Sequence, residues 1–153
     1  MYCSRWHVKV AVFVGASWVL NLHSAWAGLS GDLEVKLNGL KNGNGQVCLS
    51  LFSGPKGFPQ GGKGSSLRSS QCAVASQKTV LFKNVPLGSY AIAVIHDMNR
   101  DGRLNTNGLG IPNEGFGFSN NPPLRFGPAN FAESQVFVSG KTTTVNIQMR
   151  YLN

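Results

Sequence analysis

The stretch SYAIAVIH, residues 89–96, decides the fold class of this chain. Apolar residues occupy both the odd and the even positions of the stretch, so a strand formed here would have two apolar faces. Strands of that kind are covered on both sides inside a protein. From residue 28 onward, short alternating runs recur and no segment shows a 3.6-residue apolar period. The stretch therefore predicts the central strand of an all-β fold.

Working outward, alternating runs separated by turn signals predict about seven strands in a small antiparallel β-sandwich, Ig-like or prealbumin-like. A partly open barrel is the alternative. The Asn-Gly repeat at 42–45 and the Ser-Gly pair at 139–140 predict hairpin turns, and one long loop is expected before the last hairpin. The runs lie at residues 33–37, 47–51, 72–75, 80–82, 89–96, 131–138 and 142–150.

Residues 1–27 have the features of a cleavable secretory signal peptide. A basic start precedes an apolar stretch, and Ala25-Trp26-Ala27 supplies the small-x-small pattern that precedes cleavage. An uncleaved anchor is the alternative, but the apolar part is short for a bilayer span. We therefore expect export to the periplasm or the medium, a single domain over residues 28–153, and no transmembrane segment after cleavage.

Two cysteines, Cys48 and Cys72, follow the leader. An even pair in an exported chain favours a disulfide over a metal site or a catalytic thiol. Two free buried thiols are the alternative. His96 is the one histidine after the leader, which excludes a zinc site built from several histidines.

Residues 97–130 form a long stretch without strand patterning, and it opens with a half-motif for calcium. Asp97, Asn99 and Asp101, followed by Gly102, match D-x-N-x-D-G, the first half of an EF-hand loop. Calcium takes six to eight oxygen ligands, and alternate side chains on a tightly turning backbone converge on one point. The candidate ligands are Asp97, Asn99, Asp101, the carbonyl of Arg103, Asn105 and Glu114.

The second half of the motif is missing. Gly108 stands where an EF-hand places a bidentate Glu, and Glu114 is the carboxylate that could fold back to fill the gap. With so few carboxylates, the expected affinity for Ca²⁺ is on the order of 10⁻⁴–10⁻³ M. The alternative is a loop held by its own Asp and Asn side chains, with no metal.

A hydrolase-like enzyme that uses His96, Asp97 and Glu114 is the competing hypothesis. Such a site would pair the histidine with a carboxylate and with a serine such as Ser119. Consecutive strand residues point to opposite faces, so Asp97 is poorly placed to orient His96. We therefore predict a non-catalytic protein, with His96 hydrogen-bonded to the loop at the rim of the sheet.

The later part of the loop combines glycines with aromatic residues. Phe116 and Phe118, with Asn120 and Asn121, could form a contact surface for a sugar or a peptide. The alternative is that the phenylalanines pin the loop onto the sandwich while the glycines permit its turns. Together with His96, these residues are the candidate ligand-contact set.

Charge gives weaker guidance about partners. The chain has 14 Lys+Arg against 6 Asp+Glu, and the basic residues are scattered without a run of three. This distribution argues against nucleic-acid binding. Attraction to an anionic polysaccharide or another cell-envelope component is compatible with it, and a polyanion-binding module is a further alternative. The prediction is an exported, non-catalytic binding or structural accessory.

Two phrases carry a resemblance to a known family. LGSYAIAVIHDMNRDG at 87–102 and GIPNEGFGFSNN at 110–121 resemble DUF2141, a domain-of-unknown-function family of exported bacterial proteins. The resemblance covers nearly all of the chain after the leader, and Met98 departs from the Glu common there. It implies export and a compact β domain, but no activity, because none is established for the family. The phrase at 82–90 is similar to prealbumin-like modules, at the level of fold only.

Overall fold

The computed structural model describes residues 29–123, 125 and 127–152. The predicted signal peptide lies outside these residues. Within them, no helix has the length and apolar character needed to cross a membrane.

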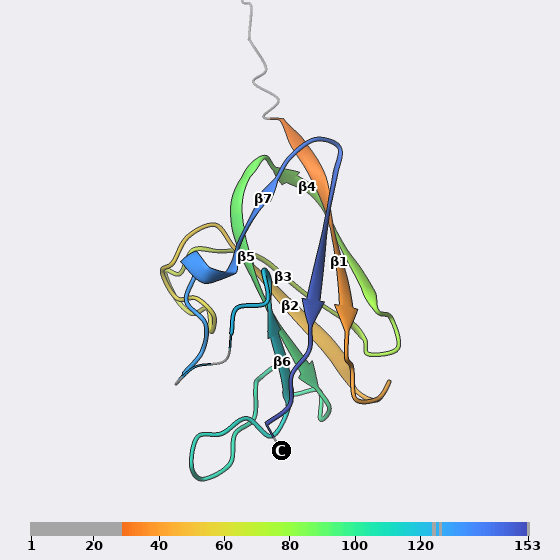
Figure 1. Ribbon diagram of the computed structural model, residues 1–153, viewed down its shortest axis with the longest axis vertical. Helices are drawn as coiled ribbons and strands as arrows, with labels where there is room; N and C mark the ends of the chain where they lie inside the picture. The colour runs from red at the N-terminus through yellow and green to blue at the C-terminus, as the bar shows by residue number, and fades with distance from the viewer. Residues whose placement is uncertain (1–28, 124, 126, 153) are drawn as a thin grey trace, which may run out of the picture.

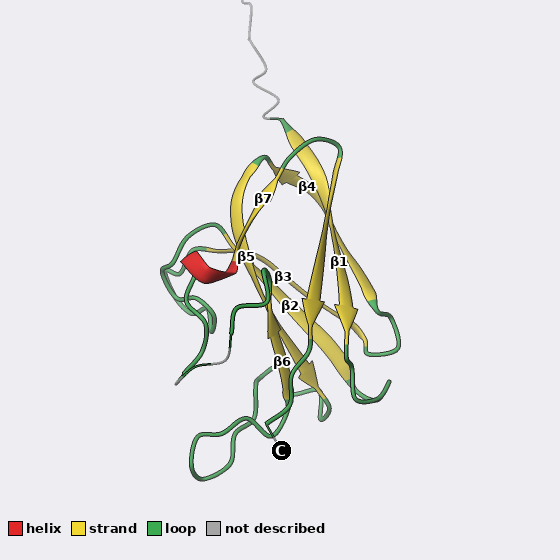
Figure 2. Ribbon diagram, viewed as in Figure 1, coloured by secondary structure: helices red, strands yellow, loops and turns green. Residues whose placement is uncertain are grey.

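The described residues form a β-sandwich of two sheets, which confirms the predicted fold class (Figures 1 and 2). The smaller sheet has the order β4-β1-β8, and the larger has the order β3-β2-β5-β6, with β7 paired to the start of β5. The strands are β1 (Ser30–Asn38), β2 (Gln46–Phe52), β3 (Leu67–Val74), β4 (Thr79–Pro86), β5 (Gly88–Asp97), β6 (Gly115–Phe118), β7 (Gln135–Val138) and β8 (Thr142–Gln148). A 3₁₀ turn, η1 (Ala132–Ser134), precedes β7.

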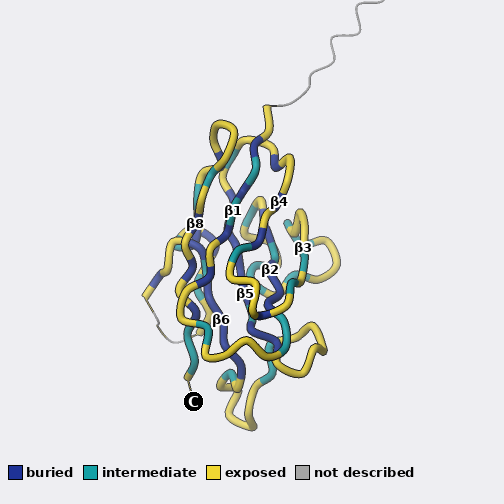
Figure 3. Tube along the Cα trace, turned by 90° about the vertical axis from the view of Figure 1, so that its right-hand side faces the viewer, coloured by how far each residue is buried: buried dark blue, intermediate teal, exposed yellow. Residues whose placement is uncertain are grey.

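Strand β5 is the predicted central strand, because β2 pairs with one side of it and β6 and β7 pair with the other. Ile92 and Val94 face the core between the sheets, whereas Ala91 and Ala93 belong to a second apolar cluster on the opposite face. Burial on both faces explains the continuous apolar run of this strand. Buried residues concentrate along the strands in Figure 3, and exposed residues concentrate in the connections.

Both predicted hairpins are wrong, although the turns are present. β1 and β2 belong to different sheets, as do β7 and β8, so each turn carries the chain from one layer to the other. β8 instead runs parallel to β1. Turn residues specify a sharp reversal of the chain, but the partner of each strand is set by which apolar face it must bury.

The long segment after β5 contains a strand that the sequence analysis missed. β6 pairs with residues 93–96 of β5. Its glycines allow close approach: a Cβ at Gly117 would lie 2.8 Å from Ile147 Cγ2, and one at Gly115 would lie 2.4 Å from the Tyr151 ring. Gly-Phe-Gly-Phe does alternate with period two, but glycine has low strand propensity, and this hid the strand.

The structure joins Cys48 to Cys72 in the predicted disulfide. The two residues are directly opposite each other on β2 and β3, and their Cα atoms are 4.1 Å apart. β3 is an edge strand whose side chains are mostly exposed. The disulfide therefore ties a weakly buried strand to the rest of the sandwich.

Candidate functional site

The candidate site is the loop of residues 98–114, which connects β5 to β6. It projects beyond one end of the sandwich, at the end opposite to the beginning of β1 (Figures 1 and 2). Its outer part is a narrow finger closed by a bridge between Thr106 and Pro112. Asn107 stabilises the tip, because its Oδ1 accepts hydrogen bonds from the amides of Leu109 and Ile111 at 2.9 and 3.0 Å.

Asp97 forms the base of the loop and is fully buried at the end of β5. Its Oδ1 accepts the Asp101 amide at 3.1 Å, and its Oδ2 accepts the Gly102 amide at 2.8 Å and Gln46 Nε2 at 2.7 Å. Burial raises the pKa of Asp97, but the hydrogen bonds from Gln46, Gly102 and Asp101 outweigh it, so the pKa lies below its ordinary value of 3.8. The carboxylate is thus held ionised by groups of the fold itself.

Asp101 is exposed and organises the first turn of the loop. Its Oδ2 accepts both Asn105 Nδ2 and Asn99 Nδ2 at 3.0 Å, and its Oδ1 accepts the Arg103 amide at 2.9 Å. These bonds, of which the one from Asn105 has the largest effect, lower the pKa of Asp101. Asn99 Oδ1 also accepts the Asp101 amide at 3.2 Å. The turn is therefore held by its own Asp and Asn side chains.

Glu114 folds back toward the base of the loop, as the calcium hypothesis requires, and is almost fully buried. Its Oε1 accepts the Met98 amide at 2.9 Å, and its Oε2 accepts the Asn105 amide at 3.0 Å. The carboxylate therefore closes the loop by joining two parts of its backbone.

A calcium ion needs oxygen ligands that are free to accept it. Asp97 Oδ1, Asp101 Oδ1 and both Glu114 oxygens accept hydrogen bonds from backbone amides, and a carboxylate oxygen has room for a second partner. Asn105, however, presents its amide nitrogen to Asp101, so it would have to turn its oxygen inward to act as a ligand. Across the described ranges, no cluster of three or more His, Cys, Asp and Glu side chains has a geometry ready to hold a metal. A calcium site built from these residues would therefore need the carboxylates to come closer together and Asn105 to turn its side chain.

His96 lies near the end of β5, at the rim of the sheet, and is fully buried. Its ring is hydrogen-bonded to Asn44 and Tyr151 and not to the loop, so that part of the prediction is wrong. Its Nε2 lies 2.8 Å from the Asn44 carbonyl, which can only accept, so Nε2 carries the proton. Its Nδ1 therefore accepts the Tyr151 hydroxyl at 2.7 Å, and the Tyr151 oxygen accepts the Lys41 amide at 3.0 Å. Sequence reasoning missed Asn44 and Tyr151, because no local pattern links residues so far apart in the chain.

The structure does not assemble a hydrolytic site from the candidate residues. His96 contacts Asn44 and Tyr151, whereas Asp97 and Glu114 each bind backbone amides of the loop. Ser119 opposes Ile92, four strand positions from His96, which corresponds to about 13 Å along the strand. Ser119 is fully buried, where it accepts the Ile92 amide and donates to the Ser134 carbonyl.

The aromatic candidates Phe116 and Phe118 lie on β6, after the loop, and pack onto the sandwich. Phe116 is buried, and the ring of Phe118 lies 5.9 Å from those of Phe116 and Phe58. Asn120 Nδ2 donates to the Glu133 carbonyl, and Asn121 connects the segment after β6 to β8 by donating to the Asn146 carbonyl. The two asparagines also adopt left-handed backbone angles, with φ of 61° and 48°. These contacts hold the segment on the sandwich, and Phe118 also lines a small cavity.

The fold and the loop define this chain as an all-β sandwich domain in which a loop of Asx turns joins two paired strands of one sheet. A family model described as "Uncharacterized protein conserved in bacteria (DUF2141)" matches residues 35–146. The chain belongs to this family, as the sequence resemblance predicted. Comparisons with curated proteins and with solved structures find no match.

Acid is expected to destabilise the protein through the loop carboxylates. The pKa values of Asp97 and Asp101 in the folded protein lie below 3.8, so the unfolded chain takes up protons first and stability is lost as the pH falls through the folded values. The melting temperature should therefore fall steeply below pH 3.8. Asp97→Asn should flatten this dependence, because it removes one of the two loop carboxylates whose pKa is lowered in the folded protein. An identical slope in wild type and Asp97→Asn would contradict the assignment.

Proposed function

We propose that this protein is an exported, non-catalytic accessory domain of the bacterial envelope or the extracellular space, with a low-affinity calcium loop. The observation that carries the proposal is that the polar side chains which a hydrolase would use are already hydrogen-bonded within the fold. His96, Asp97 and Glu114, which a hydrolase would need free, are buried and hydrogen-bonded to structural partners. Groups held in this way stabilise a loop rather than act on a substrate.

Export is supported by two independent features. The leader at residues 1–27 has the pattern of a signal peptide, and the Cys48–Cys72 disulfide is typical of an oxidising compartment. A domain of this size that is tied by a disulfide and carries a compact loop is suited to a binding or structural task outside the cytoplasm.

The calcium part of the proposal is supported by the oxygens gathered at the base of the loop. Asp97 Oδ1 and Asn99 Oδ1 both lie within hydrogen-bond distance of the same amide, that of Asp101, so the alternate side chains of the motif do converge. Asp97, Asn99, Asp101, Asn105, Glu114 and the Arg103 carbonyl would hold the ion. Calcium would add charge neutralisation to a loop that its own hydrogen bonds already shape.

Calcium is expected to stabilise the oxidised protein against heat. A ligand that binds only the folded state at ten times its dissociation constant contributes about 1.4 kcal/mol, which is a rise of a few degrees in a domain of this size. The measurement is the melting temperature in 10 mM Ca²⁺ (about ten times the expected dissociation constant) against excess chelator. Asp101→Ala should abolish the rise, whereas Asp32→Ala, outside the loop, should keep it. An unchanged wild-type melting temperature would remove the calcium loop from the proposal.

A further inference from the structure

A groove lies between the two edge strands on the open side of the sandwich. β3 pairs with β2 alone and β4 pairs with β1 alone, so these strands are the edges of the two sheets. On the other side the sheets are joined, because Phe116 of β6 forms a bridge with Arg150 just after β8. The groove is lined by residues of β3 and β4 and has a volume of about 400 Å³. That volume lies within the range of small-molecule sites.

The groove has an apolar floor and a polar rim. Leu51, Phe82 and Tyr90 belong to the core of the sandwich and also line the groove. The groove is also lined by the polar and basic residues Arg68, Ser69, Gln71, Lys83 and Asn84, together with Leu81, Val85 and Pro86. Among the described residues that line it, none is acidic. An apolar floor with a few polar groups around it is the usual composition of a binding site.

Most polar side chains of the rim have no partner in the described part of the chain. Gln71 Nε2 crosses from one sheet to the other and donates to the Leu81 carbonyl at 3.1 Å. Among the residues that the structure describes, however, neither Arg68 nor Lys83 is in an ion pair, and the side chains of Ser69 and Asn84 make no hydrogen bond. The nearby carboxylate of Asp32 accepts the backbone amide of Asn84 at 3.1 Å and does not line the groove.

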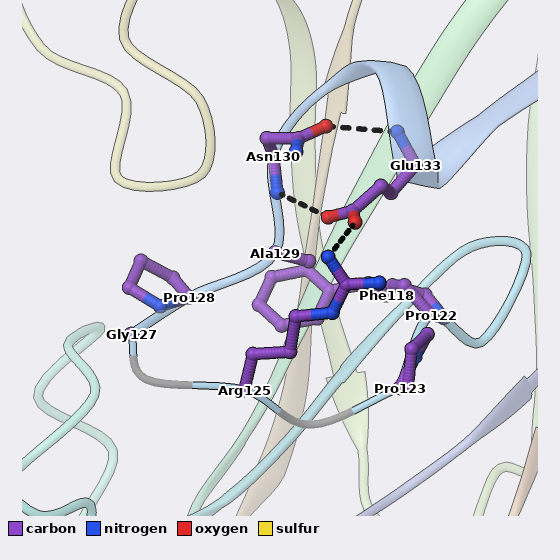
Figure 4. A pocket seen from close by; sticks show the side chains of 9 residues that line it. All are labelled: Phe118, Pro122, Pro123, Arg125, Gly127, Pro128, Ala129, Asn130 and Glu133. Atoms are coloured by element: carbon purple, nitrogen blue, oxygen red, sulfur yellow. Dashed lines mark hydrogen bonds and ion pairs between the residues drawn. The ribbon is translucent and has the colours of Figure 1, made fainter.

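In a second cavity, unlike the groove, the charged side chains are paired. It has a volume of about 160 Å³ and is lined by Phe118, three prolines and a group of polar residues (Figure 4). Those polar groups bind one another: Arg125 Nη1 lies 3.4 Å from Glu133 Oε1, and the Glu133 amide donates to Asn130 Oδ1 at 2.9 Å. Its charges are already neutralised, whereas those of the larger groove are not.

We propose that the groove between β3 and β4 binds a small organic anion with an apolar body, such as a medium-chain carboxylate. The apolar part would lie on Leu51, Phe82 and Tyr90, and the anionic group would pair with Arg68 and Lys83 on the two sides of the groove. Two cations beside an apolar surface favour an anion, because charge-assisted hydrogen bonds are the strong ones and an uncharged chain would leave them unused. The proposal is independent of the calcium loop, since no residue of 97–114 lines the groove.

The test uses decanoate, titrated below its micelle concentration into the isotope-labelled full chain and followed by NMR. Saturable shifts are expected at residues 51, 82 and 90. The double variant Arg68→Ala/Lys83→Ala should weaken binding at least tenfold. The control is Lys56→Ala/Lys63→Ala, which removes the same charge from exposed positions that do not line the groove and should leave the affinity within twofold of wild type.

Three outcomes would overturn the proposal. The first is the absence of saturable shifts in the wild-type spectrum. The second is equal weakening in the two double variants, which would indicate general attraction to a basic protein. The third is that decanol binds as tightly as decanoate, which would leave no role for the two cations. The dispersion of each variant's spectrum shows whether it is folded. Arg68→Lys, which keeps the positive charge, should retain most of the wild-type affinity for decanoate.

Discussion

Gly45→Ala is expected to lower the free energy of unfolding by about 2–5 kcal/mol. Gly45 has a φ of 71°, and a Cβ there would lie 2.4 Å from the Asp97 carbonyl oxygen and 2.6 Å from Met98 Cα. Both atoms belong to the backbone, so they cannot turn aside as a flexible side chain would. The strain of a left-handed angle adds to the clash. Relief would move the neighbouring Asn44 carbonyl away from His96.

The matched control for this change lies two residues earlier in the same turn. A Cβ at Gly43 would meet Ser76 Cβ at 3.7 Å, an ordinary contact, and Gly43 has no positive φ. Gly43→Ala should therefore leave stability within about 0.5 kcal/mol of wild type. The measurement is urea denaturation of both variants under identical conditions. Equal stability of the two variants would show that the turn can shift freely and that Gly45 is not required for the position of Asp97.

The central strand, the disulfide and the family were predictable from the sequence because each depends on local residue types. The apolar run at 89–96 needs cover on both faces whatever its partners are, and the structure supplies that cover. The pairing of strands was not predictable in the same way. β1 and β8 are parallel neighbours from opposite ends of the described chain, and no short stretch of sequence encodes that contact.

In the candidate site, too, the local contacts were predictable and the contacts between distant residues were not. The sequence pattern placed Asp97, Asn99, Asp101 and Asn105 in one turn, and the structure joins them by hydrogen bonds within that turn. It could not foresee that Gln46 on the neighbouring strand would bind the buried carboxylate of Asp97. The groove between β3 and β4 was not predictable for a similar reason: it is formed by the edges of two sheets, which come together only after the chain has folded.

Replacing Cys48 and Cys72 with alanine is expected to lower the free energy of unfolding by about 3 kcal/mol, from the chain entropy that a loop of this length regains. The cysteines are 24 positions apart. The cost should concentrate in β3, because this edge strand has mostly exposed side chains and contributes only Ala73, which is partly buried, to the core cluster. The measurements are urea denaturation for global stability and amide hydrogen exchange for residues 67–74.

Reductant provides the control for the double alanine variant. Dithiothreitol should destabilise the wild type by an amount close to that of the double substitution, and it should have no effect on the variant, which has no thiol left in the sandwich. Because β3 supplies one side of the groove, both treatments should also weaken decanoate binding. Unchanged exchange over 67–74 after reduction would mean that backbone pairing with β2 alone holds the edge strand, and that the disulfide only limits the unfolded chain.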